Sequence, residues 1–166
     1  MDSSIAAELS DIDLSAIAAD SAELYEPVAE EAGLALETKI APGLSVRGNR
    51  ELVGQALSNL IDNAIKYGAN AEGERKIVVT VAKTAGALRV SVADHGPGID
   101  ADKREAVVKR FVRLDASRSK PGTGLGLSLV EAIMALHGGR LELADTNPGG
   151  GTARGLTASM VFPGQK

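Results

Sequence analysis

Two runs rich in β-branched residues, 76–82 and 88–93, constrain the fold of this chain more than any other feature. Only a short turn around Gly86 separates them, so they predict an antiparallel hairpin in the middle of a β-sheet. The apolar side chains of such strands must be covered by another layer. The rest of the chain therefore has to supply further strands and helices that pack on the sheet.

Three segments have apolar residues at helical spacing and predict amphipathic helices. They are residues 13–32, 50–67 and 125–136. Asn49 is the expected N-cap of the second helix, and Gly68 follows its end. His137 lies in the last turn of the third helix, where a histidine can interact favourably with the helix dipole.

Shorter segments predict the remaining strands. Residues 34–40 alternate, and residues 44–46 follow a Pro-Gly turn, so we expect these two segments to form a small hairpin. Residues 140–144 and 156–162 predict two closing strands. The order of elements indicates an α/β (α+β) two-layer sandwich, with helices on one face of a mixed, mostly antiparallel sheet.

Size and composition indicate one domain with an aliphatic core. The chain has 166 residues, with two Phe, two Tyr and no Trp, and we expect residues 1–166 to form a single domain. The absence of cysteine excludes disulfides and thiolate metal sites and fits a cytoplasmic protein. No stretch approaches the roughly 20 apolar residues that cross a bilayer, so we expect this segment to stay outside the membrane.

The charge of the chain is unevenly distributed. The net charge of −4 argues against nucleic-acid binding, which requires clustered cations. Residues 1–31 carry nine acidic side chains and no basic one, whereas residues 103–120 carry seven basic side chains and two acidic ones. This cationic segment, which includes Arg110 and Arg113 around Phe111, offers charge for a triphosphate, or it is basic surface without function.

Asn59 and Asn63 are one turn apart on the second helix and share a face. Amide oxygens are hard donors of the kind that Mg²⁺ accepts, together with waters and phosphates. Lys66 and Tyr67, one turn further, add a cation and an aromatic ring. The alternative for the asparagine pair alone is two solvated side chains on a surface helix.

Two glycine-rich segments offer ligand-binding backbone. Asp94 to Ile99 follows a buried strand, where a carboxylate could accept a hydrogen bond from an exocyclic amine such as that of adenine. Gly122 to Leu127 opens the third helix and could direct N–H groups at a phosphate, although it lacks the Walker lysine. The simpler alternatives are a turn after a strand and a helix-capping loop without a ligand.

These motifs together resemble the superfamily of gyrase, heat-shock chaperone, histidine kinase and mismatch-repair ATPases (GHKL), and most closely the histidine kinases, over residues 14–163. Residues 59–67 are similar to the asparagine box, 94–99 to the first glycine box and 111–113 to the phenylalanine box. Residues 122–127 are similar to the second glycine box and 149–152 to a third. The resemblance implies the Bergerat fold, although residues 153–155 make the last turn longer than is usual in the family.

The resemblance also implies a role for each matching residue. Asn63 would bind Mg²⁺ with help from Asn59, and Lys66 and Arg113 would contact the phosphates, so the catalytic residues would be Asn59, Lys66 and Arg113. Asp94 would bind the adenine amine, and residues 95–121 would form a mobile ATP lid. The nucleotide-binding residues implied are Asn59, Asn63, Lys66, Tyr67, Asp94, Gly96, Gly98, Ile99, Phe111, Arg113, Gly122, Thr123, Gly124, Leu125, Gly126, Leu127 and Thr152.

The resemblance further implies a reaction. ATP-hydrolysing relatives carry a glutamate base where this chain has Asn59, and an amide cannot take a proton from water. We therefore expect transfer of the γ-phosphoryl group of Mg-ATP to a histidine, leaving ADP, with little hydrolysis. Neither His95 nor His137 lies in a His-Glu sequence on a long amphipathic helix.

The acceptor histidine is therefore expected on a separate dimerisation and phosphotransfer domain, absent here, from which a response regulator would take the phosphoryl group. This domain alone would be a monomer without autophosphorylation activity, and its parent kinase a homodimer. Two alternatives remain: a serine kinase or ATPase of the same superfamily, and a degenerate interaction module that does not respond to nucleotide.

Overall fold

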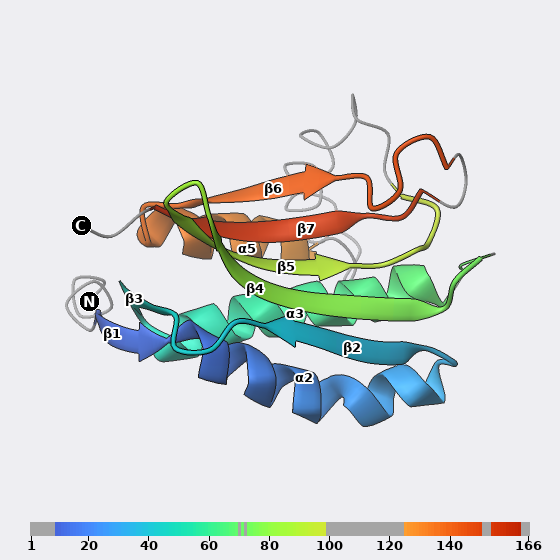
Figure 1. The fold of residues 1–166 in the computed structure, drawn as a ribbon, viewed down its shortest axis with the longest axis horizontal. Helices are drawn as coiled ribbons and strands as arrows, with labels where there is room; N and C mark the ends of the chain where they lie inside the picture. Colours follow the sequence, from blue (N-terminus) through green and yellow to red (C-terminus); the bar gives the residue numbers. More distant parts are fainter. Residues whose placement is uncertain (1–8, 70, 72, 99–124, 151–153, 164–166) are drawn as a thin grey trace.

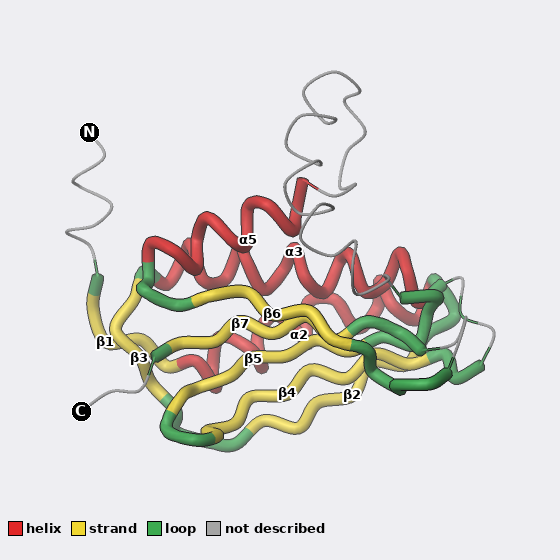
Figure 2. The backbone as a smooth tube through the Cα atoms, turned by 90° about the horizontal axis from the view of Figure 1, so that it is seen from above, coloured by secondary structure: helices red, strands yellow, loops and turns green. Residues whose placement is uncertain are grey.

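The computed structural model describes residues 9–69, 71, 73–98, 125–150 and 154–163, which form two layers. The elements are β1 (Ser10–Asp13), α2 (Leu14–Glu31), β2 (Ala35–Ile40), β3 (Ser45–Gly48), α3 (Arg50–Gly68), β4 (Lys76–Thr84), β5 (Ala87–Ala93), α5 (Leu125–Leu136), β6 (Arg140–Ala144) and β7 (Thr157–Phe162). Helices α3 and α5 lie on one side of the strands (Figure 2), and α2 runs alongside β2 (Figure 1). The predicted two-layer α/β sandwich is confirmed.

The main sheet has five strands in the order β2-β4-β5-β7-β6. Strand β2 pairs with β4 in parallel, and the other pairs are antiparallel. The central hairpin of β4 and β5 is confirmed, with Ala85 and Gly86 at positive φ in its turn. Strand β5 therefore lies in the middle of the sheet, and its C-terminal end is flanked by β4 and β7.

The predicted small hairpin of residues 34–40 and 44–46 is wrong. Strand β2 joins the main sheet beside β4, and β3 pairs instead with β1, a strand that was not predicted. The pairing of β1 with β3 places Ile12 opposite Val46, and both side chains are buried. Burial against the helices therefore decides the partner of each strand, and a local alternation pattern does not contain that information.

The helix ends follow the local signals. Asn49 Oδ1 accepts a hydrogen bond from the N–H of Leu52 at 3.0 Å, which confirms the predicted N-cap. The third predicted helix is confirmed as α5. His137 follows the end of α5, where it was predicted to interact with the helix dipole, and its Nε2 also accepts a hydrogen bond from the N–H of Asn49 at 3.0 Å. The proton therefore lies on Nδ1, which donates to the carbonyl oxygen of Ile133 at 2.8 Å.

The core lies between the helices and the inner face of the sheet. Its largest fully buried side chains are aliphatic apart from one aromatic, Phe162, as the composition predicts. Two of the few buried polar side chains, Asn63 and Asp94, line one small pocket at the end of this core. Among the described residues, no helix is long and apolar enough to cross a membrane.

Candidate functional site

Asp94 directly follows β5 and is 2% exposed. Its Oδ1 accepts hydrogen bonds from the N–H of Gly96 at 2.9 Å and from the N–H of Leu156 at 3.2 Å. Burial raises the pKa of the Asp94 carboxyl to about 6, although these two bonds and the nearby His95 lower it. No residue that the structure describes donates to Oδ2, so one carboxylate oxygen is fixed in place and the other can accept a bond from a ligand.

Three glycines allow the backbone around Asp94 to pack closely. A Cβ on Gly96 would overlap the carbonyl oxygen of Tyr67 at the end of α3. Gly98 and Gly155 have positive φ, and a Cβ on Gly155 would overlap the carbonyl oxygen of Asp94. Residues 94–98 therefore fit between α3 and the turn before β7 only because these positions lack side chains.

Helix α3 contributes Asn63 and Tyr67, which are one turn apart. Asn63 is 6% exposed, and its Nδ2 has no hydrogen-bond partner within the described structure. Burial and the charge of Asp94 raise the pKa of the Tyr67 hydroxyl. Because a buried polar group without a partner costs about 1–3 kcal/mol, a ligand that accepts a hydrogen bond from Nδ2 of Asn63 would remove this penalty.

A small pocket joins these groups. Its lining residues are Leu60, Asn63, Ala64, Tyr67, Val92, Asp94, Leu127, Leu156 and Ala158. The predicted residues Asn63, Tyr67, Asp94 and Leu127 are thus brought together by α3, the end of β5 and the first turns of α5. The apolar wall formed by β5, β7 and α3 was not predicted, because alternating strand residues do not show which of them face a site.

Two predicted residues of α3 lie outside this pocket. Asn59 is half-buried and does not line it. Lys66 is exposed, and its Nζ lies 3.2 Å from Oδ2 of Asp62 in an ion pair. To reach a phosphate, Lys66 would have to exchange this surface ion pair for the ligand, at a cost of about 1 kcal/mol or less.

Several predicted residues cannot be placed. Ile99, Phe111, Arg113, Gly122, Thr123, Gly124 and Thr152 lie outside the described residues, as does nearly all of the predicted lid. Leu125 and Gly126 belong to the first turn of α5. The contacts of all these residues with nucleotide remain predictions.

The turn before β7 contributes two residues that sequence reasoning missed. Gly155 donates its N–H to the carbonyl oxygen of Gly96 at 2.9 Å, and the next residue, Leu156, is bonded to Asp94. The predicted third glycine box, residues 149–152, ends three residues before Gly155. A glycine directly before the last predicted strand, residues 156–162, was the available signal in the sequence.

The loop after α3 lies near His95, the residue after Asp94. Arg75 donates hydrogen bonds to the carbonyl oxygens of Ala71 and Ala69, both at 3.0 Å, and so satisfies groups beyond the helix end. Next to it, Glu74 Oε1 lies 3.5 Å from Nε2 of His95. This loop and the segment after Asp94 are therefore neighbours in the structure.

The pocket is suited to recognition. A fixed carboxylate, a buried amide and an aromatic ring can bind a planar ligand that carries an N–H donor. Within the described part of the chain, no three His, Cys, Asp or Glu residues group as a metal site. An Mg²⁺ ion would instead use amide oxygen together with waters and the phosphates of a ligand, and Asn63, which lines the pocket, carries an oxygen of this kind.

Known proteins resemble the chain in sequence. Residues 48–163 match the family described as histidine kinase-, DNA gyrase B-, and HSP90-like ATPase. The chain is 39% identical to the signal transduction histidine-protein kinase/phosphatase MprB of Mycolicibacterium smegmatis over 75% of this chain and 25% of that protein. It is 32% identical to the sensor-like histidine kinase SenX3 of the same species over 87% of this chain and 37% of that protein. The chain thus spans only a quarter to somewhat over a third of these relatives.

Solved structures agree with the sequence matches. The mycobacterial sensor histidine kinase MprB superposes with a TM-score of 0.77 at 27% identity, over 95% of this chain and 98% of that one. Full-length ShkA in complex with AMPPNP superposes with a TM-score of 0.75 at 27% identity, over 96% of this chain and 32% of that one.

Proposed function

Because the chain belongs to the family of histidine kinase-, DNA gyrase B- and HSP90-like ATPases, we propose that it binds Mg-ATP and transfers the γ-phosphoryl group to a histidine on a separate dimerisation and phosphotransfer domain. A response regulator would receive the phosphoryl group next. The parent kinase would be a homodimer and this domain by itself a cytoplasmic monomer. The shared pocket of Asp94 and Asn63 carries the proposal, because it supplies a fixed acceptor and a buried amide whose Nδ2 has no partner among the described residues.

The adenine base would enter the pocket beside Tyr67. The exocyclic amine of adenine donates two hydrogens, and Oδ2 of Asp94 is the acceptor for one of them. The apolar wall formed by Val92, Leu156 and Ala158 would exclude water from this bond and so strengthen it. Guanine has a carbonyl oxygen at the corresponding ring position, and the Asp94 carboxylate would repel it.

The phosphates would extend along α3 towards the start of α5. Asn63, with Asn59 one turn before it, would hold Mg²⁺, which would neutralise phosphate charge when bound. Lys66, Arg113 and the backbone of residues 122–126 are predicted to contact the phosphates. Gly96, Gly98, Ile99, Phe111, Leu127 and Thr152 would complete the nucleotide site.

Catalysis would depend on how the domain positions ATP relative to the acceptor histidine. A nitrogen of the acceptor imidazole forms a bond to the γ-phosphorus, the bond from that phosphorus to the bridging oxygen breaks, and ADP leaves. The imidazole loses its ring proton to solvent. No carboxylate stands at position 59 to activate water, so hydrolysis would be slow relative to transfer.

The test is a transfer reaction in two parts. This domain is mixed with the separately produced histidine-bearing domain of its full-length protein and with ATP labelled at the γ-phosphate. Label on the acceptor that is lost in acid is expected, and acid-stable label on serine would contradict the proposal. Calorimetry with Mg-ADP is the companion measurement, and an absence of binding would remove the basis for the nucleotide site.

A further inference from the structure

Strand β2 forms one edge of the main sheet in the part of the chain that the structure describes. It lies at the end of the sheet and pairs only with β4 among the described strands. The N–H groups of Ala35 and Ala41 donate towards β4, to the carbonyl oxygens of Arg75 and Val81, at 3.0 and 2.9 Å. Backbone groups alternate along a strand, so those of the even-numbered residues, Leu36, Thr38 and Ile40, point away from β4. An edge of this kind can pair with an additional strand.

A groove of about 310 Å³ runs between this edge and α2. Its lining residues are Ala19, Ala22, Glu23 and Glu26 of α2 and Leu36, Thr38 and Ile40 of β2. The β2 residues whose side chains line the groove are thus the same ones whose backbone groups face the open edge. Figure 1 shows α2 and β2 side by side along this border. Alanine, leucine and isoleucine side chains form the apolar part of the groove, and Thr38 and two glutamates add polar groups.

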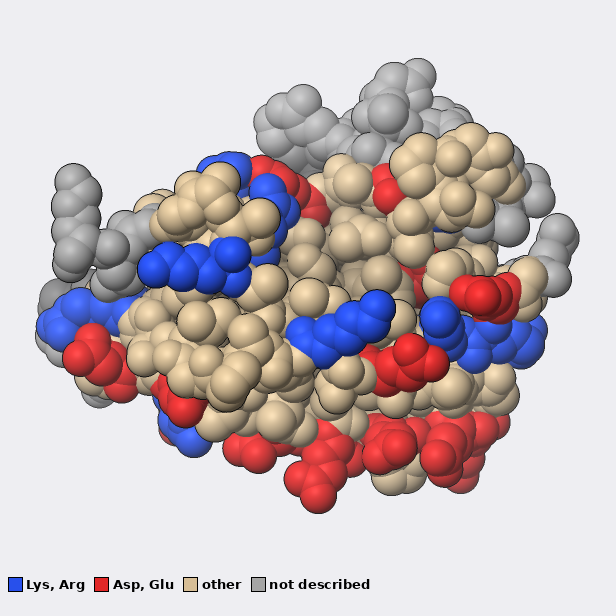
Figure 3. Space-filling view, viewed as in Figure 1, with Lys and Arg blue, Asp and Glu red and all other residues tan. Residues whose placement is uncertain are grey.

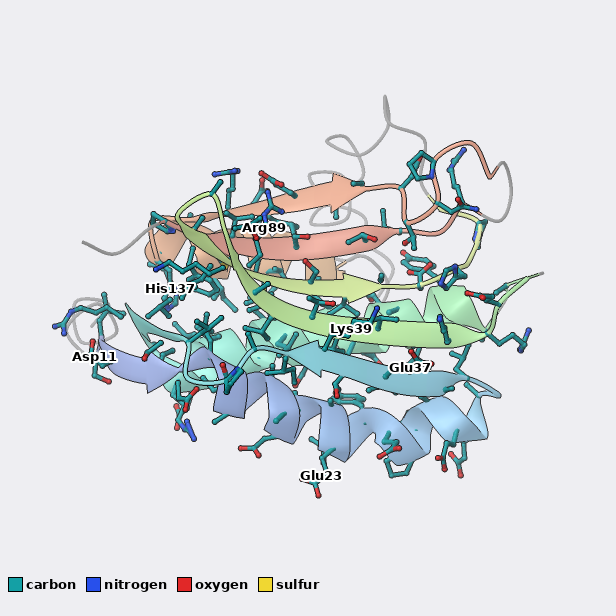
Figure 4. All side chains as sticks on the ribbon, viewed as in Figure 1. Asp11, Glu23, Glu37, Lys39, Arg89 and His137 are labelled. Atoms are coloured by element: carbon teal, nitrogen blue, oxygen red, sulfur yellow. The ribbon has the colours of Figure 1, made fainter. Side chains whose placement is uncertain are left out.

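The rim of the groove is negatively charged. None of the described Lys, Arg or His side chains forms an ion pair with Glu23 or Glu26. Acidic side chains follow the lower border of the molecule in Figure 3, where Figure 1 places α2. Figure 4 shows Glu23 extending from α2 into solvent, whereas Glu37 and Lys39 lie on the sheet. The charge at this rim therefore favours a positively charged ligand.

We propose that the groove between α2 and β2 binds an extended, cationic protein segment, which adds a strand to the sheet beside β2. Side chains alternate along such a segment, so every second one would face α2. Lys or Arg at these positions would pair with Glu23 and Glu26. Their aliphatic stems would cover the apolar part of the groove near Ala22 and Leu36.

A second copy of this chain does not fit the groove. Pairing of β2 with β2 of another copy would bring the glutamates of both α2 helices to one seam, where no basic residue lines the groove. A cationic partner would instead be attracted by the glutamates of α2. The proposal is independent of the nucleotide site, since neither Asp94 nor Asn63 lines the groove.

The first experiment measures binding of a labelled peptide, Lys-Thr-Lys-Thr-Lys-Thr-Lys, by fluorescence anisotropy at low salt. The Glu23→Lys, Glu26→Lys double variant is expected to weaken binding by about tenfold or more. The matched control is Asp20→Lys, Glu31→Lys, which changes the same charge on the same helix away from the groove and should weaken binding by less than about threefold. Equal loss in both double variants, or no binding to the unchanged protein, would overturn the proposal.

A second readout separates strand addition from simple charge attraction. Amide hydrogen exchange followed by NMR should slow by about tenfold or more at Leu36, Thr38 and Ile40 when the peptide is bound, because these N–H groups gain partners. Exchange at Lys39, whose N–H faces β4, should change little. A peptide with N-methyl groups on alternate residues should bind more weakly. Binding that leaves the three edge amides unprotected would contradict strand addition.

Discussion

Asp94 and Leu156 are joined by a reciprocal pair of hydrogen bonds. The N–H of Asp94 donates to the carbonyl oxygen of Leu156 at 3.0 Å, and the N–H of Leu156 donates to Oδ1 of Asp94 at 3.2 Å. The first bond continues the pairing of β5 with β7 by one residue, and the second fixes the carboxylate relative to that pair. The position of the carboxylate therefore depends on the backbone of the turn before β7.

Asp94→Asn is expected to stabilise the domain at neutral pH while abolishing adenine recognition. The pKa of Asp94 is raised to about 6 in the folded protein from an ordinary value of 3.8, so ionisation costs about 3 kcal/mol of folding stability once the pH exceeds 6. Asparagine keeps the Oδ1 acceptor and has no charge. Urea unfolding should show a gain of up to about 3 kcal/mol at pH 7.5.

The pH dependence of the stability difference provides a control for this prediction. Between pH 4 and 6 the folded state binds more protons than the unfolded state, so the stability of the unchanged protein falls as the pH rises through this window. The advantage of Asp94→Asn should therefore shrink as the pH is lowered from 7.5 towards 4. A variant that is less stable than the unchanged protein at pH 7.5 would show that the buried charge carries no cost.

Binding of adenosine is expected to weaken in mild acid. With a pKa of about 6 for Asp94, about a quarter of the carboxyl is ionised at pH 5.5, so affinity should fall about threefold or more from its value at pH 7.5. Adenosine is chosen because it lacks a phosphate that titrates in this range. NMR titration at the two pH values measures the effect, and equal affinity at both would argue against Asp94 as the acceptor.

Gly155→Ala is expected to displace Asp94. Gly155 has φ +71°, and a Cβ there would overlap the carbonyl oxygen of Asp94, so we expect a loss of about 2 kcal/mol or more in stability together with weaker Mg-ADP binding. Gly149→Ala is the matched control, since φ is +84° but nothing lies within 4 Å of the added Cβ. It should cost about 1 kcal/mol and leave Mg-ADP binding unchanged. Calorimetry on both variants makes the comparison.

Asn63→Leu is expected to separate stability from function. Leucine has a similar size and removes the buried Nδ2 that lacks a partner, so the free energy of unfolding should rise by about 1 kcal/mol. Mg-dependent nucleotide binding should be lost, because the amide oxygen is removed with it. Asn59→Leu, on the half-buried position one turn earlier, serves as the comparison and should give no comparable gain in stability. Retention of Mg-ADP binding by Asn63→Leu would exclude the metal role.

Local signals in the sequence were sufficient for the helices, for every strand except β1, and for part of the site. The N-cap at Asn49 and the hairpin of β4 and β5 depend on residues close together in the chain, so their patterns can be read directly. Asn63, Tyr67 and Asp94 were predicted from motifs, and the structure places them around one pocket. Their contacts with nucleotide and metal remain predictions.

The tertiary structure alone decided how distant segments pair. It joined β2 to β4 and β3 to β1, and it brought Leu156 to Asp94 across 62 positions of the chain. It also buried Nδ2 of Asn63 with no partner in the described part of the chain, and it placed the edge of β2 beside the glutamates of α2. These features arise from the burial of many side chains at once, and the free energy of that packing is not contained in any short segment of the sequence.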